Sequence, residues 1–262
     1  MLEIQNIFKT FNAGTINEKR ALNGVSLTLN DGDFVTVIGG NGAGKSTLMN
    51  AIAGVFGVDS GKILIDGMDL THLPEYKRAK YIGRVFQDPM MGTAATMQIE
   101  ENLALAARRG MKRTLRIGIT KAEREEYKEQ LKILGLGLEN RMTSKVGLLS
   151  GGQRQALTLL MATLVTPKIL LLDEHTAALD PGTAEIVLEL TKKIVAENNI
   201  TCLMITHNLA SSLALGNRTI MMADGHILLD LKQEQRQGLT PDDLLKMFRN
   251  QGLDNDRILF SN

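Results

Sequence analysis

The sequence is poor in the residues that mark secreted or membrane-spanning proteins. Its 262 residues include one cysteine, Cys202, five prolines and no tryptophan. A single cysteine cannot form an internal disulfide, which excludes a disulfide-stabilised scaffold and suits a reducing cytosol. No stretch approaches the roughly 18–20 apolar residues that span a bilayer, and Met1–Asn6 lacks the basic start and apolar segment of a signal peptide. We therefore expect a cytosolic chain that reaches a membrane only through another protein.

A strong net charge is also missing. The formal net charge is +1, and 23% charged with 44% hydrophobic residues is the composition of an ordinary globular protein. Because no global basic field would attract nucleic acid, no nucleic-acid partner is expected. The length allows one large domain, or one domain with an inserted subdomain.

The apolar patterns predict an α/β core that is interrupted by a helical segment. Val25–Leu29 alternates apolar and polar residues, which is typical of a half-buried strand, and Phe34–Ile38 is an almost continuous apolar run, as in a strand covered on both faces. Similar runs return at Ile169–Leu172 and Thr201–Ile205, with a helical pattern between them, and this order favours a parallel sheet. Cys202, inside the last run, is predicted to be a buried strand residue. Residues from about 88 to 166 have mostly helical spacing.

A glycine-rich loop follows the strand Phe34–Ile38 and matches the phosphate-binding (P-loop) pattern of a glycine, four residues, then Gly44, Lys45 and Ser46. Glycines let backbone N–H groups face phosphate oxygens, and the helix that follows adds the positive end of its dipole. Lys45 is expected to reach the β- and γ-phosphates, and the Ser46 hydroxyl a Mg²⁺ ion. The rival dinucleotide pattern from Gly40 requires glycine where Lys45 stands, and it fails. The predicted ATP-binding residues of the loop are Gly39, Gly40, Asn41, Gly42, Ala43, Gly44, Lys45, Ser46 and Thr47.

Two acidic residues end the apolar run Ile169–Leu172. On a parallel strand beside the P-loop strand, Asp173 would lie near Mg²⁺, and Glu174 would orient and polarise an attacking water. The alternative is a strand whose polar end simply reaches solvent.

Further motifs indicate a family. Leu149–Gln153 precedes a helical pattern, with Ser150 in a cap position and two glycines that make a second anion-binding helix start. Three more segments accompany it: Gln87 within Val85–Pro89, Asp180 within Ala178–Pro181, and His207 after Ile205. Together these motifs closely resemble the ATP-binding cassette (ABC) family, over essentially the whole chain and in the family's order.

The resemblance implies one ABC ATPase domain with a P-loop NTPase (RecA-like) α/β core, an N-terminal antiparallel β subdomain and an inserted α-helical subdomain. Residues 1–87 and 167–262 would form the core with the β subdomain, and residues 88–166 the helical subdomain. In such proteins two cassettes pair head to tail, and each ATP lies between the P-loop of one copy and the signature loop of the other. The signature loop here is Ser150, Gly151, Gly152 and Gln153.

Roles for single residues also come from the resemblance. It implies that Gln87 links the ATP and Mg²⁺ site to a transmembrane partner, that Asp180 lies at the dimer contact, and that His207 contacts the γ-phosphate. Phe11 stands where the family has an aromatic residue stacked on adenine, with ordinary core as the alternative. The implied catalytic residues are Lys45, Glu174 and His207, and the Mg²⁺ ligands are Ser46, Gln87 and Asp173.

The chain departs from the family pattern at His175, where a proline is usual, and at Ala156, where an arginine is frequent. His175 is either functional or a neutral substitution. The variant around it is similar to a bacterial group of importer cassettes, some linked to aromatic amino-acid uptake. The basic run Arg108–Arg116 would meet acidic lipid headgroups or a permease loop, or would be a solvated face.

The leading functional hypothesis is therefore the ATPase of an importer. It would work as a homodimer on separate permease subunits at the inner face of the cell membrane, with an extracellular solute-binding protein as an indirect partner. The alternatives are an exporter or lipoprotein-extraction ATPase, and a non-transport member such as a cluster-assembly factor. The residues identify neither the cargo nor the permease.

Overall fold

The computed structural model describes residues 1–111 and 118–250, and the chain divides into two compact units. Unit 1 is Met1–Tyr81 together with the chain from Asn199 onward, and unit 2 is Ile82–Asn198. The helical segment 88–166 that the sequence predicts falls inside unit 2. The predicted boundaries of the helical subdomain, after residue 87 and before residue 167, differ from the boundaries of the two units and stay a prediction.

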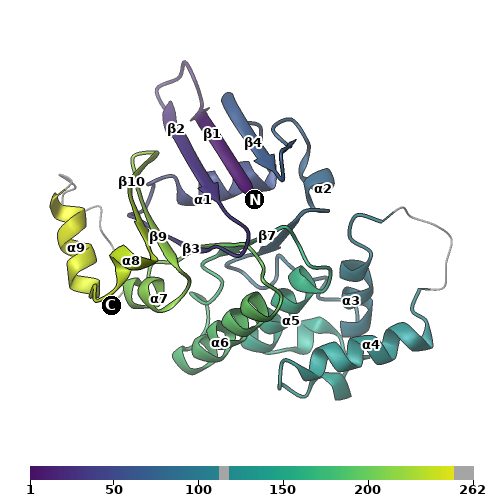
Figure 1. Cartoon of the computed structure of the whole chain (residues 1–262). Coiled ribbons are helices and arrows are strands. Elements are labelled where there is room, and N and C mark those ends of the chain that lie inside the picture. The colour runs from purple at the N-terminus through teal and green to yellow at the C-terminus, as the bar shows by residue number, and fades with distance from the viewer. Residues whose placement is uncertain (112–117, 251–262) are drawn as a thin grey trace. The chain divides into compact units, whose positions relative to one another are not determined.

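The first sheet of unit 1 is antiparallel. It has the strand order β2-β1-β4-β5, and β1, β2 and β4 lie side by side in Figure 1. The strands are β1 (Leu2–Phe11), β2 (Lys19–Leu29), β4 (Ser60–Ile65) and β5 (Met68–Asp69). Along the end of β2, Val25, Leu27 and Leu29 are buried while Ser26 and Thr28 are exposed, so the alternation predicted a half-buried strand correctly.

The other strands of unit 1 are mainly parallel. β3 (Phe34–Ile38) pairs in parallel with β8 (Cys202–Ile205) and with β9 (Arg218–Ala223), and β10 (His226–Lys232) pairs antiparallel with β9. Every residue of β3 is buried, as the continuous apolar run predicted. Cys202 is fully buried too, and this burial raises the pKa of its thiol. The unit 1 helices are α1 (Lys45–Ala53), α2 (Glu75–Arg78), α7 (Leu209–Ala214), α8 (Gln233–Arg236) and α9 (Pro241–Asn250).

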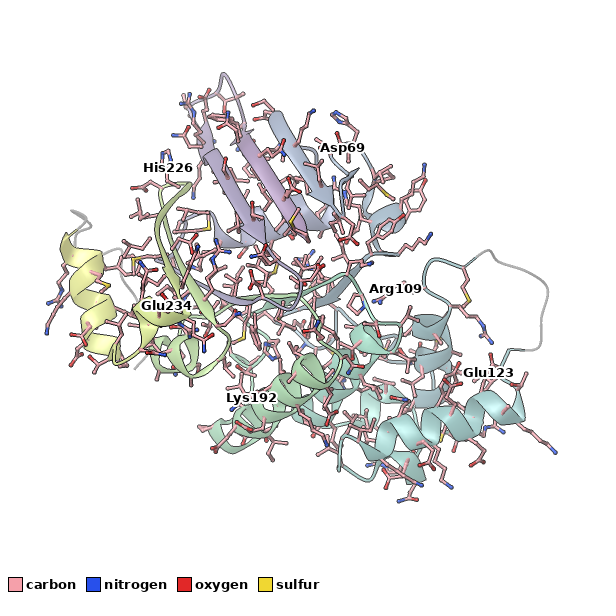
Figure 2. All side chains as sticks on the ribbon, viewed as in Figure 1. Asp69, Arg109, Glu123, Lys192, His226 and Glu234 are labelled. Carbon is pink, nitrogen blue, oxygen red and sulfur yellow. The ribbon has the colours of Figure 1, made fainter. Side chains whose placement is uncertain are left out.

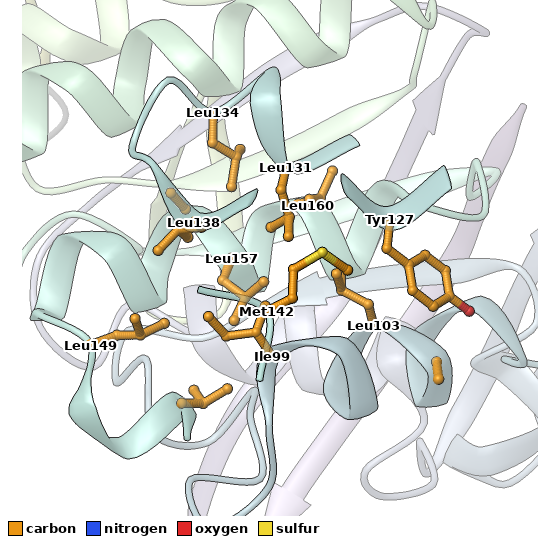
Figure 3. Close-up of a cluster of buried hydrophobic side chains, with 13 residues drawn as sticks. Ile99, Leu103, Tyr127, Leu131, Leu134, Leu138, Met142, Leu149, Leu157 and Leu160 are labelled. Carbon is orange, nitrogen blue, oxygen red and sulfur yellow. The ribbon is translucent and has the colours of Figure 1, made fainter. Parts of the chain in front are cut away.

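Unit 2 combines two parallel strands with a helical core. β6 (Ile82–Val85) pairs in parallel with β7 (Ile169–Asp173). The helices are α3 (Ile99–Ala107), α4 (Lys121–Lys132), α5 (Gly151–Thr163) and α6 (Pro181–Glu197), with short 3₁₀ helices at Leu138–Asn140 and Val146–Leu148. Figure 3 shows the buried cluster that joins α3, α4 and α5, in which Leu103, Leu131 and Leu157 are fully buried. In the described ranges of the whole chain, no helix has the length and apolar character needed to cross a membrane.

A buried arginine satisfies the C-terminal end of the helix that follows the P-loop. Arg78 is 1% exposed, and its guanidinium donates to the carbonyl oxygens of Ala51 (2.7 Å) and Ile52 (2.8 Å) in the last turn of α1. It also donates to carbonyls of the loop before α2, at 2.9 Å to Thr71 and 2.8 Å to Leu73. Burial lowers the pKa of Arg78, while the carbonyl dipoles at the helix end stabilise its charge.

Two other helices end in the same way. Arg109, labelled in Figure 2, donates to the carbonyls of Ala162 and Val165 at the end of α5. Arg236 is 8% exposed and donates to the carbonyls at the end of α7, at Ser212, Leu213, Leu215 and Gly216. The C-terminal carbonyls of α1, α5 and α7 are therefore each satisfied by a guanidinium from a distant part of the sequence.

We predict that Arg78→Met lowers the free energy of unfolding by about 3 kcal/mol, because four carbonyl acceptors, three of them in buried hydrogen bonds, lose a charged donor. Urea unfolding followed by circular dichroism measures the change. The control is Lys77→Met, which makes the same change at the exposed neighbouring position. Equal stability of the two variants would contradict the role given to Arg78.

Candidate functional site

The P-loop in unit 1 owes its shape to glycines that pack against neighbouring backbone. It leaves the buried strand β3 at Gly39, whose φ is 150°, and a Cβ atom there would collide with the carbonyl oxygen of Met222 on β9. At Gly44, with φ 102°, a Cβ would lie 2.6 Å from the carbonyl oxygen of Ala21 on β2. Helix α1 begins directly after Gly44, and no side chain caps it. Its first backbone N–H groups are therefore not covered by a capping side chain.

Lys45 brings a buried positive charge into this loop. Its side chain is 6% exposed, and Nζ donates to the carbonyl oxygens of Gly39 (2.7 Å) and Gly40 (3.0 Å). Ser46, the next residue of α1, is exposed. An ammonium group beside an uncapped helix start forms an anion site of the kind that binds phosphate groups.

Unit 1 brings His207 to the same edge of its parallel strands. Val37 of β3 pairs with Ile205 of β8, and the Thr206 amide donates to the Val37 carbonyl at 3.2 Å. Because β3 and β8 run in parallel, the P-loop and the half-buried His207 follow their carboxyl ends, where ligands bind in such sheets. The contact of His207 with a γ-phosphate stays a prediction.

Phe11 lies at the end of β1, outside the fully buried core. It is half-buried, and its ring meets that of Phe56 edge to face, with centroids 5.2 Å apart. Nζ of Lys9 lies 5.5 Å from the centroid of each ring. The adenine-stacking role of Phe11 stays a prediction.

The sequence did not reveal a second lysine near the P-loop. Lys19 is the cross-strand partner of Phe11 at the start of β2. A Cβ atom built on Gly42 would lie 3.2 Å from Lys19 Nζ, so this exposed ammonium lies directly over the loop. The register of the β1–β2 hairpin sets this position, and no motif marks it.

In unit 2, Gln87 and Asp173 follow the ends of neighbouring parallel strands. Val85 of β6 pairs with Leu172 of β7, so Asp173 at the end of β7 and the exposed Gln87 after β6 lie at one edge. Both side chains offer oxygen atoms, the ligands that Mg²⁺ prefers.

Arg84 of β6 is a partner of Asp173 that the motifs did not indicate. Arg84 Nη2 lies 3.7 Å from Asp173 Oδ2, and its guanidinium stacks 4.4 Å from the centroid of Phe86. The side chains of Arg84 and Asp173 are both more than four-fifths buried, so solvent screens this pair weakly. In the sequence, only the charge of Arg84 within the apolar strand Ile82–Val85 could have indicated this partner.

Glu174 directly follows β7 in a backbone conformation that is rare for a side-chain-bearing residue. Its φ is 46°, in the left-handed region, and its carbonyl accepts the Ala177 amide at 2.9 Å to form a turn. The next residue, His175, is 1% exposed, and its Nε2 lies 3.0 Å from Thr191 Oγ1 on α6. Burial lowers the pKa of His175 to about 4, so its imidazole is neutral at pH 7.

The signature loop forms the start of α5, as predicted. Ser150 Oγ accepts the Gln153 amide (3.3 Å), and Gln153 Oε1 accepts the Ser150 amide (3.2 Å), which closes a capping box around two glycines. A Cβ on Gly152 would collide with Cγ2 of Thr183 on α6, so a side chain there would displace that methyl group. Contacts of this loop with a second ATP stay predictions.

Asp180 has a local structural role. Its carboxylate caps α6 by accepting the Thr183 amide at 3.1 Å, and hydrogen bonds from Thr183 lower the pKa of Asp180. The dimer contact of Asp180 stays a prediction.

Two residues of the basic run Arg108–Arg116, Arg108 and Arg109, bind other groups within unit 2. Arg108 Nη2 forms an ion pair at 3.1 Å with Oε1 of Glu123, which is labelled in Figure 2, and Arg109 caps α5. Lys112, Arg113 and Arg116 lie outside the described residues.

The residues present fit an ATP–Mg²⁺ ligand. In unit 1, the uncapped start of α1 and the Lys45 ammonium fit phosphate groups, and Ser46 offers a hydroxyl oxygen. In unit 2, taken by itself, Gln87 and Asp173 supply hard oxygen atoms. Across residues 1–111 and 118–250, no group of three or more His, Cys, Asp and Glu could hold a metal ion. That is compatible with Mg²⁺, which proteins usually bind through one or two side chains together with substrate phosphates.

Comparisons with known proteins agree with this geometry. The ABC transporter family model matches residues 22–177. A tyrosine transport ATP-binding protein of Clostridioides difficile is 45% identical, over 95% of this chain and 98% of the relative. The methionine import ATP-binding protein MetN of Corynebacterium diphtheriae is 37% identical, but the match covers 87% of this chain and only 64% of that longer relative.

Solved structures give the same result. The dimeric ATP-binding cassette MJ0796, in a post-hydrolysis state bound to ADP and phosphate, is 30% identical with a TM-score of 0.76, over 89% of this chain and 99% of the other. The ADP conformation of the cassette MJ1267 is 28% identical with a TM-score of 0.77, over 95% and 98%. The α/β fold with an antiparallel β subdomain is therefore that of the P-loop ATPases, as predicted. The chain belongs to the ABC transporter family, and it is one of the family's ATP-binding and ATP-hydrolysing cassettes.

Proposed function

We propose that this chain energises the import of an aromatic amino acid, with tyrosine as the first candidate. One observation carries the proposal: the 45% identity to a tyrosine transport ATP-binding protein, which extends over nearly the full length of both chains. The methionine and polyamine relatives are import ATPases too, which favours import over export and over cluster assembly.

The proposed mechanism gives each candidate residue a step. The P-loop amides and Lys45 hold the phosphates of ATP, and Glu174 orients and polarises the attacking water. His207 contacts the γ-phosphate, and Phe11 stacks on adenine. Ser46, Gln87 and Asp173 would hold Mg²⁺, which neutralises charge on the phosphates when it is bound.

The proposed working form is a homodimer bound to membrane permease subunits. The dimeric structure of a cassette that is 30% identical supports pairing of two copies. In that pair, residues Ser150–Gln153 of each copy would complete the ATP site of the other, and Asp180 would lie at the contact. Gln87 would link the site to the permease, with the chain peripheral at the inner membrane face and an extracellular solute-binding protein delivering the cargo.

The first test is Glu174→Gln in cells that express this chain together with a candidate permease and a candidate solute-binding protein. We expect ATP binding to persist while ATP hydrolysis falls by at least about a hundredfold, because loss of a catalytic base costs that much or more. Uptake of radiolabelled tyrosine should then stop. Glu185→Gln, the same change at an exposed acid of α6, should leave both unchanged.

Two results would contradict different parts of the proposal. Undiminished hydrolysis in Glu174→Gln would refute the role of that carboxylate. Normal hydrolysis by the unaltered chain without tyrosine uptake would refute the proposed cargo, and uptake of radiolabelled methionine or spermidine would then identify the class.

A further prediction concerns Lys19, which lies over the P-loop. We expect Lys19→Met to weaken ADP binding about fivefold and to leave adenosine binding unchanged, because an exposed ammonium adds about 1 kcal/mol of attraction to phosphate charge. Isothermal titration calorimetry measures both. Arg20→Met is the matched control, since neighbouring strand residues point to opposite faces. An equal loss of ADP affinity in both variants would contradict the role of Lys19 and would show a general effect of surface charge.

A further inference from the structure

His175 connects the turn after β7 to the middle of α6 inside unit 2. It directly follows Glu174, and its ring is 1% exposed. Thr191, whose hydroxyl it meets at 3.0 Å, is fully buried. This buried imidazole, next to a candidate catalytic carboxylate, therefore has a definite hydrogen-bond partner.

The hydrogen-bond partners fix the direction of this bond. Thr191 Oγ1 also lies 2.8 Å from the carbonyl oxygen of Val187, which can only accept, so the single hydroxyl hydrogen of Thr191 is used there. Nε2 of His175 must then be the donor to Thr191. Nδ1 carries the lone pair, and it has no hydrogen-bond partner within the described residues. The chain of bonds therefore runs from His175 through Thr191 to the backbone of α6.

The backbone conformation of Glu174 has to be held by neighbouring contacts. Its left-handed φ of 46° is unfavourable for a side-chain-bearing residue, and such conformations persist only where the surroundings hold them. Glu174 and His175 share a peptide plane, so a fixed His175 restricts the backbone on one side of Glu174. The Ala177 amide, bonded to the Glu174 carbonyl, restricts the same turn.

We propose that His175 is a positioning residue for ATP hydrolysis: its hydrogen bond to Thr191 holds the turn in which Glu174 is placed for attack of water. This inference rests on the proposed function of Glu174. Small displacements of a reacting group cost large factors in rate, so breaking the bond should affect turnover more than ATP binding.

The test compares steady-state ATP hydrolysis of full-length variants. His175→Leu and Thr191→Val each remove the bond, and each should lower kcat about tenfold while KM for ATP changes less than twofold. The double variant should lose no more than the larger single loss, since both changes remove one interaction. His175→Gln keeps a donor near Nε2 and Thr191→Ser keeps the hydroxyl, so both should retain most of the activity.

Thr163→Val is the matched control for burial. Thr163 on α5 is also buried, and its hydroxyl bonds the carbonyl one turn earlier at 2.9 Å, as Thr191 does. Within the described residues its hydroxyl bonds the carbonyl oxygens of Leu159 and Leu160 and no imidazole, so loss of the hydroxyl should leave kcat unchanged. The stoichiometry of nucleotide binding measures the folded fraction of every variant. If His175→Leu does not fold, Thr191→Val alone tests the positioning role.

Wild-type kcat in folded Thr191→Val, or an equal loss in Thr163→Val, would overturn the positioning role. Glu174→Gln separates this failure from failure of the proposed function. If Glu174→Gln still hydrolyses ATP, the role of Glu174 is wrong. If Glu174→Gln is inactive while Thr191→Val is fully active, only the inference on His175 fails.

Discussion

The structure depends on how the backbone N–H and C=O groups at the two ends of α1, α5 and α7 find hydrogen-bond partners. The first amides of α1 are the predicted phosphate donors, and no side chain covers them, because α1 starts after Gly44 without a capping side chain. Its other end must still satisfy its carbonyls inside the protein, and Arg78 does so from a separate segment. Arg109 and Arg236 serve α5 and α7 in the same way. At one end of each helix a guanidinium satisfies carbonyl groups, while the other end carries or follows a candidate motif.

The candidate residues are divided between the two units in a pattern that follows strand order. Unit 1 holds the P-loop and His207 after the parallel strands β3 and β8, and unit 2 holds Gln87 after β6 and Asp173 at the end of the parallel strand β7. In each unit, parallel pairing alone brings residues far apart in sequence to one edge. The side chains around them are held by buried partners, as Arg84 and Thr191 illustrate.

Short-range patterns explain which features could be predicted. Continuous apolar runs and glycine chemistry indicated β3, the P-loop, α1 and β7, and Ser150 was recognisable as a cap. The β9–β10 hairpin was not anticipated, although its Asp224-Gly225 turn, with φ of 46° and 77°, is a strong hairpin signal. The positions of Lys19 and Arg78 depend on strand register and long-range packing. The bond from His175 to Thr191 spans a turn and half a helix, so the sequence left His175 open between a functional and a neutral role.

The central claim is that the loop before α1 holds the phosphates of ATP. Calorimetric titration of ATP into the Lys45→Met variant tests it most directly, because this change removes the one buried ammonium of the loop and leaves its glycines in place. The account predicts that ATP binds at least about tenfold more weakly, since a charge-assisted bond to phosphate is worth roughly 1.5–3 kcal/mol, and that adenosine binding does not change. Equal ATP affinity of the variant and the unaltered chain would contradict the account.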